Sequence, residues 1–299
     1  MSQTLMLPAF AKVNLRLRVL ERRDDGYHHL ETIYQTISLH DTITISVVDA
    51  PHLILSGNDR SLPGDENNLI MRAAKMLQSR FETKKGALMR LDKRIPMQAG
   101  LGGGSSNAAV TLMALARLWQ LNIPRAELIA LGARLGADVS FFFFGGTAGA
   151  AGVGDCLQPL DEAPQKFLLV LKPNANISTA AAYKALDERS LTSQYAKTIL
   201  STSQATADSV RIDFANLTND FEAVVFELEP EIGRARSALL KAGAEAALLA
   251  GSGAAVFGIF DSEDAQRRAI QAIELETGWR VFPCRTVGRA EYRDALRLS

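Results

Sequence analysis

Pro96-Met-Gln-Ala-Gly-Leu-Gly-Gly-Gly-Ser-Ser-Asn107 is the most informative segment of the chain, and it runs directly into Ala108 to Trp119. Its four glycines let backbone N–H groups turn toward one point and let a ligand approach without a Cβ in the way. The following segment has apolar residues at the spacing of one helical face. A helix that begins here adds unpaired N–H groups and a positive dipole end, so the sequence predicts a phosphate-binding loop.

A flexible Gly/Ser linker without a ligand is the alternative, but a linker does not normally join directly to a well-patterned helix. The segment also differs from two common phosphate loops. A Walker loop needs Lys-Ser or Lys-Thr after its last glycine, and no lysine lies between Gly100 and Asn107. The dinucleotide-binding fingerprint needs a glycine or alanine where Ser105 stands, so neither class fits.

Length and composition predict an ordinary globular protein with two domains. The chain has 299 residues, of which 47% are hydrophobic and 22% are charged. Its 33 basic and 33 acidic side chains leave no global basic field for nucleic acid. Cys156 and Cys284 form no CxxC pair and the four histidines show no metal-ligand spacing, which disfavours a disulfide framework or a zinc site. No apolar run is long enough to span a membrane.

From these features we expect a cytoplasmic protein without nucleic-acid or membrane partners. We further expect a monomer or weak homodimer. The first half of the chain shows a clear strand pattern, because apolar residues from Val13 to Val19 alternate with polar ones. Lys12 and Asn14 share the polar face of that strand. The other elements expected in this half are strands at Thr42 to Val48 and Ala87 to Leu91, and helices at Asn67 to Phe81 and Arg125 to Leu135.

The two prolines of the charged segment Asp155 to Lys166 mark a domain boundary, so we expect domains at 1–160 and 161–299. Residues 187–213 are polar and are expected to be loosely structured in part. The other elements expected in the second half form the order β-α-β-β-α-β of ferredoxin-like domains. They are strands at Phe167 to Leu171, Ala246 to Leu249, Ala254 to Phe260 and Arg280 to Cys284, and helices at Glu229 to Lys241 and after Ser262.

Asp138 and Lys12 are the candidate catalytic residues. Asp138 stands just before the apolar run Phe141 to Phe144, which we expect in the core. An aspartate there either caps a helix or turn, or acts as a general base near the phosphate loop. Most lysines are solvated, but Lys12 begins a half-buried strand, where it could pair with a carboxylate or neutralise a transferring phosphoryl group.

Two turn-like segments allow a structural and a functional interpretation. Asp25-Gly-Tyr-His28 is either a hairpin turn with two exposed rings, or a site where Tyr27 stacks on a planar group and His28 hydrogen-bonds to it. Gly251-Ser-Gly253 is either a plain tight turn or a second close approach of backbone to phosphate.

Three segments, in this order, resemble the motifs of the GHMP kinase superfamily of small-molecule kinases. They are Pro8-Ala-Phe-Ala-Lys-Val-Asn-Leu15, Pro96 to Asn107, and Leu249-Ala-Gly-Ser-Gly-Ala254. With Asp25-Gly-Tyr-His28 and Leu135-Gly-Ala-Asp-Val139, they are most similar to members that act on a cytidine diphosphate-linked methylerythritol. The resemblance covers nearly the whole chain. It implies an α+β fold, with a ribosomal-protein-like N-terminal domain and a ferredoxin-like C-terminal domain.

The resemblance also implies an activity, the ATP-dependent phosphorylation of the 2-hydroxyl of that substrate. Mg²⁺ is expected to bridge the ATP phosphates, and no side chain is assigned to the metal. Asp138 matches the residue that takes the hydroxyl proton, and Lys12 matches the lysine that positions it and supports developing charge.

Binding residues are carried over in the same way, as what the resemblance implies. Those that match the substrate site are Asn14 for a hydroxyl, and Tyr27, His28 and Tyr183 for cytidine. Those that match the ATP site are Pro96, Met97, Gln98, Ala99, Gly100, Leu101, Gly102, Gly103, Gly104, Ser105 and Ser106, with Asn68 and Lys93 as further contacts.

Three rival functions stay open at this point. Another kinase of the superfamily would phosphorylate an alcohol without cytidine, so Tyr27 would hardly matter. A non-catalytic member would bind nucleotide without turnover, which the presence of Lys12 and Asp138 disfavours. A nucleic-acid-binding module would suit the ribosomal-protein-like half, but the zero net charge disfavours it.

Overall fold

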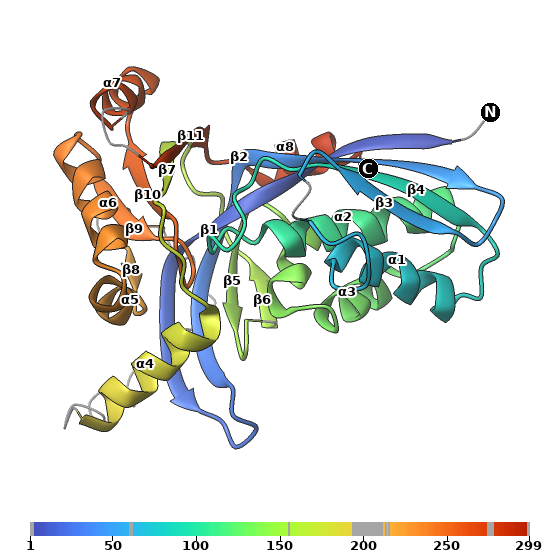
Figure 1. The fold of residues 1–299 in the computed structure, drawn as a ribbon, viewed down its shortest axis with the longest axis horizontal. Coiled ribbons are helices and arrows are strands. Elements are labelled where there is room, and N and C mark those ends of the chain that lie inside the picture. The colour runs from blue at the N-terminus through green and yellow to red at the C-terminus, as the bar shows by residue number, and fades with distance from the viewer. Residues whose placement is uncertain are drawn as a thin grey trace.

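A computed structural model describes residues 3–59, 62–154, 156–192, 212, 214, 216–273 and 278–297. Its first sheet is built around one long hairpin, β1 (Thr4–Arg22) and β2 (His28–Val48) (Figure 1). The sheet order is β3-β4-β2-β1-β8, and β5 and β6 extend it from β2. The added strands are β3 (Leu53–Gly57), β4 (Gly86–Asp92), β5 (Thr147–Ala151), β6 (Cys156–Pro159) and β8 (Thr218–Asn219).

Helices pack on this sheet to form the first core, which contains side chains such as Ile43, Leu77 and Leu112. The alternation that predicts Thr42 to Val48 as a strand reflects this packing, with Ile43 and Ile45 buried. The run Phe141 to Phe143 is buried, which confirms its predicted place in the core. The helices are α1 (Leu69–Arg80), α2 (Gly103–Leu118), α3 (Arg125–Ala133), the 3₁₀ helix η1 (Ala137–Phe143) and α8 (Arg289–Ala295).

The second sheet has the order β11-β7-β10-β9, and every neighbouring pair is antiparallel. Numbered along the chain, this is the strand order 4-1-3-2, which confirms the ferredoxin-like arrangement expected from the sequence. The strands are β7 (Phe167–Lys172), β9 (Ala246–Leu249), β10 (Val256–Phe260) and β11 (Arg280–Arg285). The helices of this half are α4 (Thr179–Thr192), α5 (Glu222–Leu228), α6 (Pro230–Lys241) and α7 (Glu263–Ile273).

A shared core joins the two sheets. Ala11, Val13 and Leu15 of β1 pack with Val170 and Phe257 of the second sheet. At the far end of the chain, Tyr292 of α8 packs in the first core rather than the second. The domain boundary at 160 stays a prediction. The shared core between the sheets and the packing of Tyr292 in the first core both join residues from the two sides of this boundary.

The structure differs from the sequence prediction in two segments. Of residues 187–213, expected to be loosely structured, the described part up to Thr192 is helical, and most of the rest lies outside the described residues. The expected strand at Thr42 is only the second half of the longer strand β2. The first half of β2 was not predicted, because it pairs with both β1 and β5 and lacks a simple alternation of polar and apolar residues. In the described part of the chain, no helix is long and apolar enough to cross a membrane.

Candidate active site

The glycine loop of residues 96–102 ends at the N-terminus of α2, which begins at Gly103, earlier than the periodic segment suggested. Gly102 is the N-cap, with φ +68°, and no side chain caps the helix. A Cβ on Gly102 would lie 3.0 Å from the Cγ of Lys12 and from the Cζ of Phe142. The first N–H groups of α2 are therefore available to an anion, and the loop backbone passes too close to Lys12 for a larger residue.

Two buried polar atoms near the N-terminus of α2 have no hydrogen-bond partner among the described residues. They are the Oγ of Ser106 and the Oδ1 of Asn107, whose side chains are almost fully buried. Buried polar atoms without a partner are rare in native proteins and point to an unseen ligand, ion or water. This arrangement fits a loop that holds phosphate groups.

Lys12 and Asp138 meet at this loop. The Nζ of Lys12 lies 3.3 Å from the Oδ2 of Asp138 and donates a 2.8 Å hydrogen bond to the Oδ1 of Asn14. The backbone N–H of Lys12 donates to the carbonyl of Leu101, at 3.0 Å, which ties β1 to the loop. The side chain of Lys12 is 4% exposed and that of Asp138 is 32% exposed. Lys12 is thus the buried partner, and Asp138 is the one that a substrate can reach.

Two residues of β2, Tyr34 and Thr32, complete this network and were missed by sequence reasoning. The hydroxyl of Tyr34 donates to the Oδ1 of Asp138, at 2.9 Å. The Oγ1 of Thr32 accepts from the amide of Asn14, at 2.7 Å, and donates to the carbonyl of Arg16, at 2.7 Å. The signal was weak, because the predicted strand at Thr42 did not extend back to place Tyr34 opposite Asn14.

The end of the β1–β2 hairpin lies against α4 (Figure 1). His28 stacks on Tyr183 with ring centroids 5.1 Å apart, and its Nε2 lies 2.7 Å from the Oδ1 of Asp187. The hairpin interpretation holds for Tyr27, which is 67% exposed, but it is wrong for His28, which α4 buries. Burial, and then the negative charge of Asp138, raise the pKa of Tyr183 to about 12.

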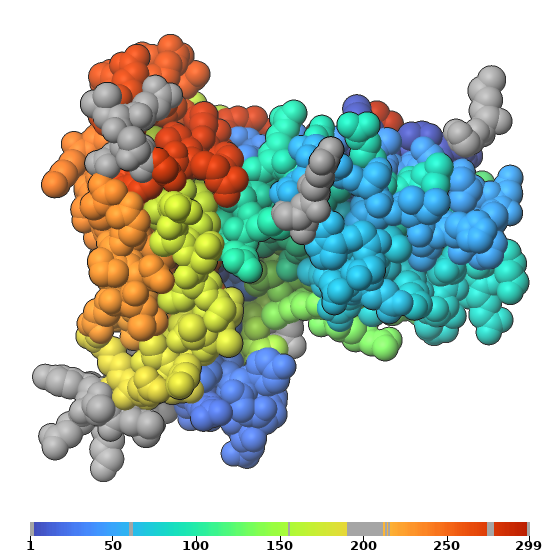
Figure 2. All heavy atoms as spheres, in the orientation of Figure 1, coloured from blue at the N-terminus to red at the C-terminus, as the bar shows by residue number. Residues whose placement is uncertain are grey.

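Asp187 is a second site residue that sequence reasoning missed. Tyr183 and Asp187 lie one helical turn apart on α4, so both face the hairpin. The influence of Asp138 on the pKa of Tyr183 indicates that the hairpin end and the Lys12–Asp138 pair belong to one region. In Figure 2 the surface is hollowed between the yellow segment that contains α4 and the green and teal segments that contain the loop and η1.

Lys93 and Asn68, the two other expected nucleotide contacts, already have structural partners. The Nζ of Lys93 lies 2.9 Å from the Oδ2 of Asp41, a fully buried carboxylate, and also bonds the carbonyl of Ile95. Burial lowers the pKa of Lys93, and Asp41 partly offsets this. The Oδ1 of Asn68 caps α1 by accepting from the N–H of Ile70, at 3.0 Å.

Lys93 nevertheless lies next to the start of α2, and Leu69, which follows Asn68, lies next to Gly104. A Cβ on Gly103 would be 3.3 Å from the Nζ of Lys93. A small cavity of about 40 Å³ opens beside Asn68. Its lining includes the apolar side chains Leu55, Leu62 and Leu91.

Two family models match this chain. The GHMP kinases N terminal domain matches residues 68–146, and the GHMP kinases C terminal domain matches residues 207–277. The chain belongs to the GHMP kinase family. It is therefore a small-molecule kinase, in a family whose phosphate donor is ATP.

Individual relatives of this GHMP kinase extend over almost its whole length. One relative is the 4-diphosphocytidyl-2-C-methyl-D-erythritol kinase of Solibacter usitatus. It is 43% identical, and the match covers 98% of this chain and 92% of that protein. The protein of the same name from Chlorobium chlorochromatii is 40% identical, and the match covers 93% of this chain and 96% of that protein. A crystal structure of 4-(cytidine 5'-diphospho)-2C-methyl-D-erythritol kinase superposes with a TM-score of 0.77 at 32% identity, covering 95% of this chain and 100% of that one.

More distant solved structures share the fold alone. The structure of L. major mevalonate kinase in complex with R-mevalonate gives a TM-score of 0.72 at 15% identity, covering 96% of this chain and 97% of its own. These matches confirm the predicted α+β fold of this GHMP kinase.

The third motif of this GHMP kinase, Gly251-Ser-Gly253, is a turn that supports the glycine loop. The N–H of Ala254 donates to the carbonyl of Gln98, at 3.1 Å, and Gly100 packs against Ala250 so closely that a Cβ there would lie 1.7 Å from its carbonyl oxygen. The amide of Asn219 donates to the carbonyl of Gly251, at 2.7 Å. The motif therefore holds the loop from the side of the second sheet.

Proposed function

We propose that this GHMP kinase transfers the γ-phosphoryl group of ATP to the 2-hydroxyl of 4-diphosphocytidyl-2-C-methyl-D-erythritol. The observation that carries the proposal is the pair of buried Lys12 and partly exposed Asp138 beside the uncapped N-terminus of α2. The substrate is inferred from the names of relatives at 40–43% identity over nearly the full length. The His28–Tyr183–Asp187 cluster supports it, because stacked rings with a fixed imidazole suit a planar base.

In this proposal, the loop of residues Pro96 to Ser106 holds the ATP phosphates, mainly through the free backbone N–H groups at the start of α2. Phosphoryl transfer has a loose transition state, so positioning and charge neutralisation supply most of the catalysis. The buried ammonium of Lys12 stabilises negative charge that develops on the transferred group. Its low exposure strengthens that effect, because nearby water is excluded.

Asp138 orients the substrate hydroxyl and accepts its proton as the new O–P bond forms. Lys12 interacts with the Oδ2 of Asp138 and Tyr34 hydrogen-bonds its Oδ1, so both oxygens are held in place. The role of Asn14 is narrower than expected, because Lys12 and Thr32 already use its carbonyl oxygen and one amide hydrogen. The second amide hydrogen and the second lone pair of the carbonyl oxygen are left for a substrate hydroxyl.

Cytidine binds at the hairpin end in this proposal. The exposed ring of Tyr27 offers a stacking surface, and Tyr183 and Asp187 hold the imidazole of His28. When the carboxylate of Asp187 accepts from Nε2–H, the Nδ1 of His28 is an acceptor for an amino group. Asn68 and Lys93 stay predicted nucleotide contacts, and the cavity of about 40 Å³ beside Asn68 is too small to hold an adenine as it stands.

Mg²⁺ is part of the proposal, since it neutralises and orients the ATP phosphates in phosphoryl transfer. The buried, unpartnered hydroxyl of Ser106 fits a place next to such an ion, and Ser105 stands beside it. Among the described residues there is no cluster of three or more His, Cys, Asp or Glu side chains that would hold a metal by themselves.

Three expectations from the sequence stay predictions. They are the lack of nucleic-acid and membrane partners, the cytoplasmic location, and the monomer or weak homodimer.

The experiment that tests this function measures ADP release from Mg-ATP with three alcohols in parallel. We expect turnover with 4-diphosphocytidyl-2-C-methyl-D-erythritol and little with mevalonate or homoserine. Tyr27→Ala should raise the KM of the cytidine substrate. Turnover of mevalonate or homoserine that is indifferent to Tyr27→Ala would instead assign the protein to another branch of the family.

A further inference from the structure

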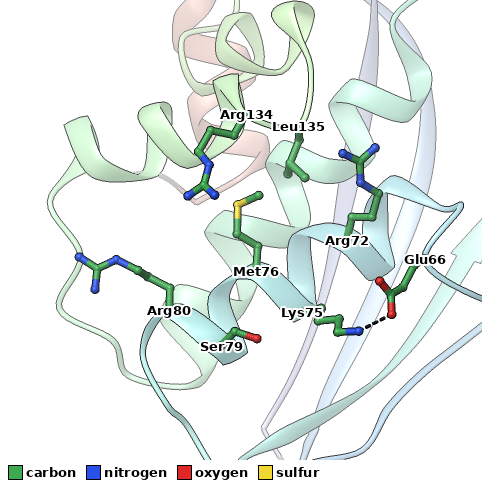
Figure 3. Close-up of a pocket in the computed structure, with 8 residues that line it drawn as sticks. All are labelled: Glu66, Arg72, Lys75, Met76, Ser79, Arg80, Arg134 and Leu135. Carbon is green, nitrogen blue, oxygen red and sulfur yellow. Dashed lines mark hydrogen bonds and ion pairs between the residues drawn. The ribbon is translucent and has the colours of Figure 1, made fainter.

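A second concave site lies between α1 and the end of α3 (Figure 3). Its volume is about 460 Å³, within the usual range of small-molecule sites. None of its lining residues belongs to the glycine loop or to the catalytic network. The basic pocket, as we call it, is lined by Glu66, Arg72, Lys75, Met76, Ser79, Arg80, Arg134 and Leu135.

One face of α1 supplies most of the basic pocket. Arg72, Lys75, Met76, Ser79 and Arg80 recur at helical spacing and form one stripe, while the opposite face is buried in the first core. The helix Leu69–Arg80 contains no acidic residue to balance its three cations. Arg72 and Lys75 are like charges three positions apart and repel, and Arg72 stands near the N-terminal end, where the helix dipole disfavours a cation. This stripe therefore costs stability that a bound anion would restore.

Only some of these cations have an acidic partner. Lys75 pairs with Glu66, and Arg80 lies 3.2 Å from Glu127. The guanidinium groups of Arg72 and Arg134 form no ion pair with any described residue. Figure 3 shows these two arginines on different sides of the pocket, one from α1 and one from the end of α3, with Met76 and Leu135 between them.

We propose that the basic pocket binds a small phosphorylated ligand, with a diphosphate held between Arg72 and Arg134 and a short apolar part on Met76 and Leu135. Guanidinium groups bind phosphate oxygens through paired, charge-assisted hydrogen bonds. Two arginines on separate elements suit an anion with two phosphate groups better than a single inorganic phosphate. The half-buried thioether and the buried leucine supply an apolar floor.

The pocket is connected to the kinase centre at both ends. Leu135 lies three residues before Asp138, and the backbone N–H of Arg72 donates to the carbonyl of Asn68, at 3.0 Å. A ligand that fixes α1 against the end of α3 thus acts on both the N-cap of α1 and the segment that carries Asp138. The expected effect on kinase kinetics rests on the proposed function, but binding itself does not.

The test is a calorimetric titration of the full chain with inorganic pyrophosphate, with the kinase nucleotide site saturated by ADP. Arg72→Gln/Arg134→Gln should weaken binding by about a hundredfold or more, since each lost charge-assisted bond contributes at least about tenfold. The matched control, Arg117→Gln/Arg268→Gln, removes the same charge from exposed positions outside the pocket and should leave affinity near the wild-type value. Inorganic phosphate should bind more weakly than pyrophosphate.

Several results would overturn the proposal. The proposal is wrong if the wild type does not bind pyrophosphate, or if it binds phosphate as tightly as pyrophosphate. It is also wrong if the pocket variant binds pyrophosphate as tightly as the wild type, or if the control variant loses as much affinity as the pocket variant. Thermal unfolding excludes a folding defect, because Arg72→Gln without ligand should unfold no earlier than the wild type, and pyrophosphate should raise the Tm of the wild type alone. If pyrophosphate changes the KM of ATP in the wild type but not in the pocket variant, the basic pocket is coupled to the kinase centre. Binding without that change would leave the site intact and remove only its link to the kinase.

Discussion

Asp138 and Lys12 have different exposures, and that difference separates their roles. Lys12 is almost fully buried, with Asn14, Asp138 and the ring of Tyr34 around its ammonium, which lies 5.3 Å from the ring centroid. A buried ammonium is tolerated only with such partners. Asp138 is a third exposed, so it is the member of the pair that a substrate hydroxyl can reach. Substitutions at Lys12 therefore disturb folding as well as chemistry, whereas substitutions around Asp138 report mainly on chemistry.

Tyr34→Phe removes one hydrogen bond to Asp138 and leaves the ring in the core. We expect kcat to fall by about 3- to 10-fold with KM nearly unchanged, because an ordinary hydrogen bond contributes about 0.5–1.5 kcal/mol. Steady-state kinetics with varied substrate and ATP measure this. An unchanged kcat would show that the hydroxyl does not orient Asp138 during transfer.

Asp187→Asn weakens the partner that fixes the imidazole of His28. We expect the KM of the cytidine substrate to rise by about tenfold with kcat little changed, because the carboxylate lies 2.7 Å from the ring nitrogen and acts on binding alone. Asp24→Asn, on the exposed turn of the same hairpin, is the matched control and should behave like the wild type. A loss confined to kcat would contradict the positioning role.

At the scale of elements, the glycine loop depends on the turn between β9 and β10. The loop carbonyls of Gln98 and Ala99 accept from the N–H groups of Ala254 and Ala255, at 3.1 and 3.3 Å. Gly100 has φ +73°, a conformation that disfavours any residue with a Cβ. The loop is thus held from one side by β1 and from the other by the second sheet, which fixes it before nucleotide arrives.

Gly100→Ala tests this support. The new Cβ would lie 1.7 Å from the carbonyl oxygen of Ala250, so the loop and the turn must separate. We expect the free energy of unfolding to fall by about 2 kcal/mol or more, measured by urea denaturation. Gly104→Ala is the control, since its Cβ meets only the side chain of Leu69 at 3.4 Å and lies in helix α2, so stability should be kept. Equal stability of both variants would show that the contact does not constrain the loop.

The packing of α4 on the hairpin gives a pH-dependent expectation. The pKa of Tyr183 is about 12 in the folded protein and near 10 when unfolded, so between these values only the unfolded state releases the proton. The stabilisation is complete below pH 10 and is lost as the pH rises toward 12. We expect the wild type to lose about 1 kcal/mol more than Tyr183→Phe between pH 9 and 11. Tyr27→Phe, at an exposed ring, should follow the wild type in urea unfolding. Parallel curves for wild type and Tyr183→Phe would contradict the cause assigned to the shift.

Local patterns predicted the elements that carry the site but not all their contacts. The alternation around Val13 placed Lys12 and Asn14 on one face of a strand, and the glycine run located the start of α2. Tyr34 and Asp187 were missed for a physical reason. Each acts through a partner more than 100 positions away, Asp138 for Tyr34 and His28 for Asp187, and only tertiary packing brings such pairs together.

At the scale of the whole molecule, the centre of β1 contributes side chains to the core that lies between the two sheets. Its odd-numbered residues Ala11, Val13 and Leu15 lie in the core between the sheets, so the even-numbered Lys12 and Asn14 face the opposite side, where η1 brings Asp138. The parity could be predicted from the sequence, but the second sheet that covers the odd face could not. The catalytic pair is therefore fixed by the junction of the two halves of the fold.

The most direct test compares the wild type with Asp138→Ala in ADP release from Mg-ATP and 4-diphosphocytidyl-2-C-methyl-D-erythritol. Binding of ATP to both proteins is measured by titration. We expect kcat to fall by about 10² or more in the variant, the usual scale for loss of a general base, while ATP affinity stays near the wild-type value. A variant that retains near-normal kcat would remove Asp138 from the chemistry and contradict the central claim.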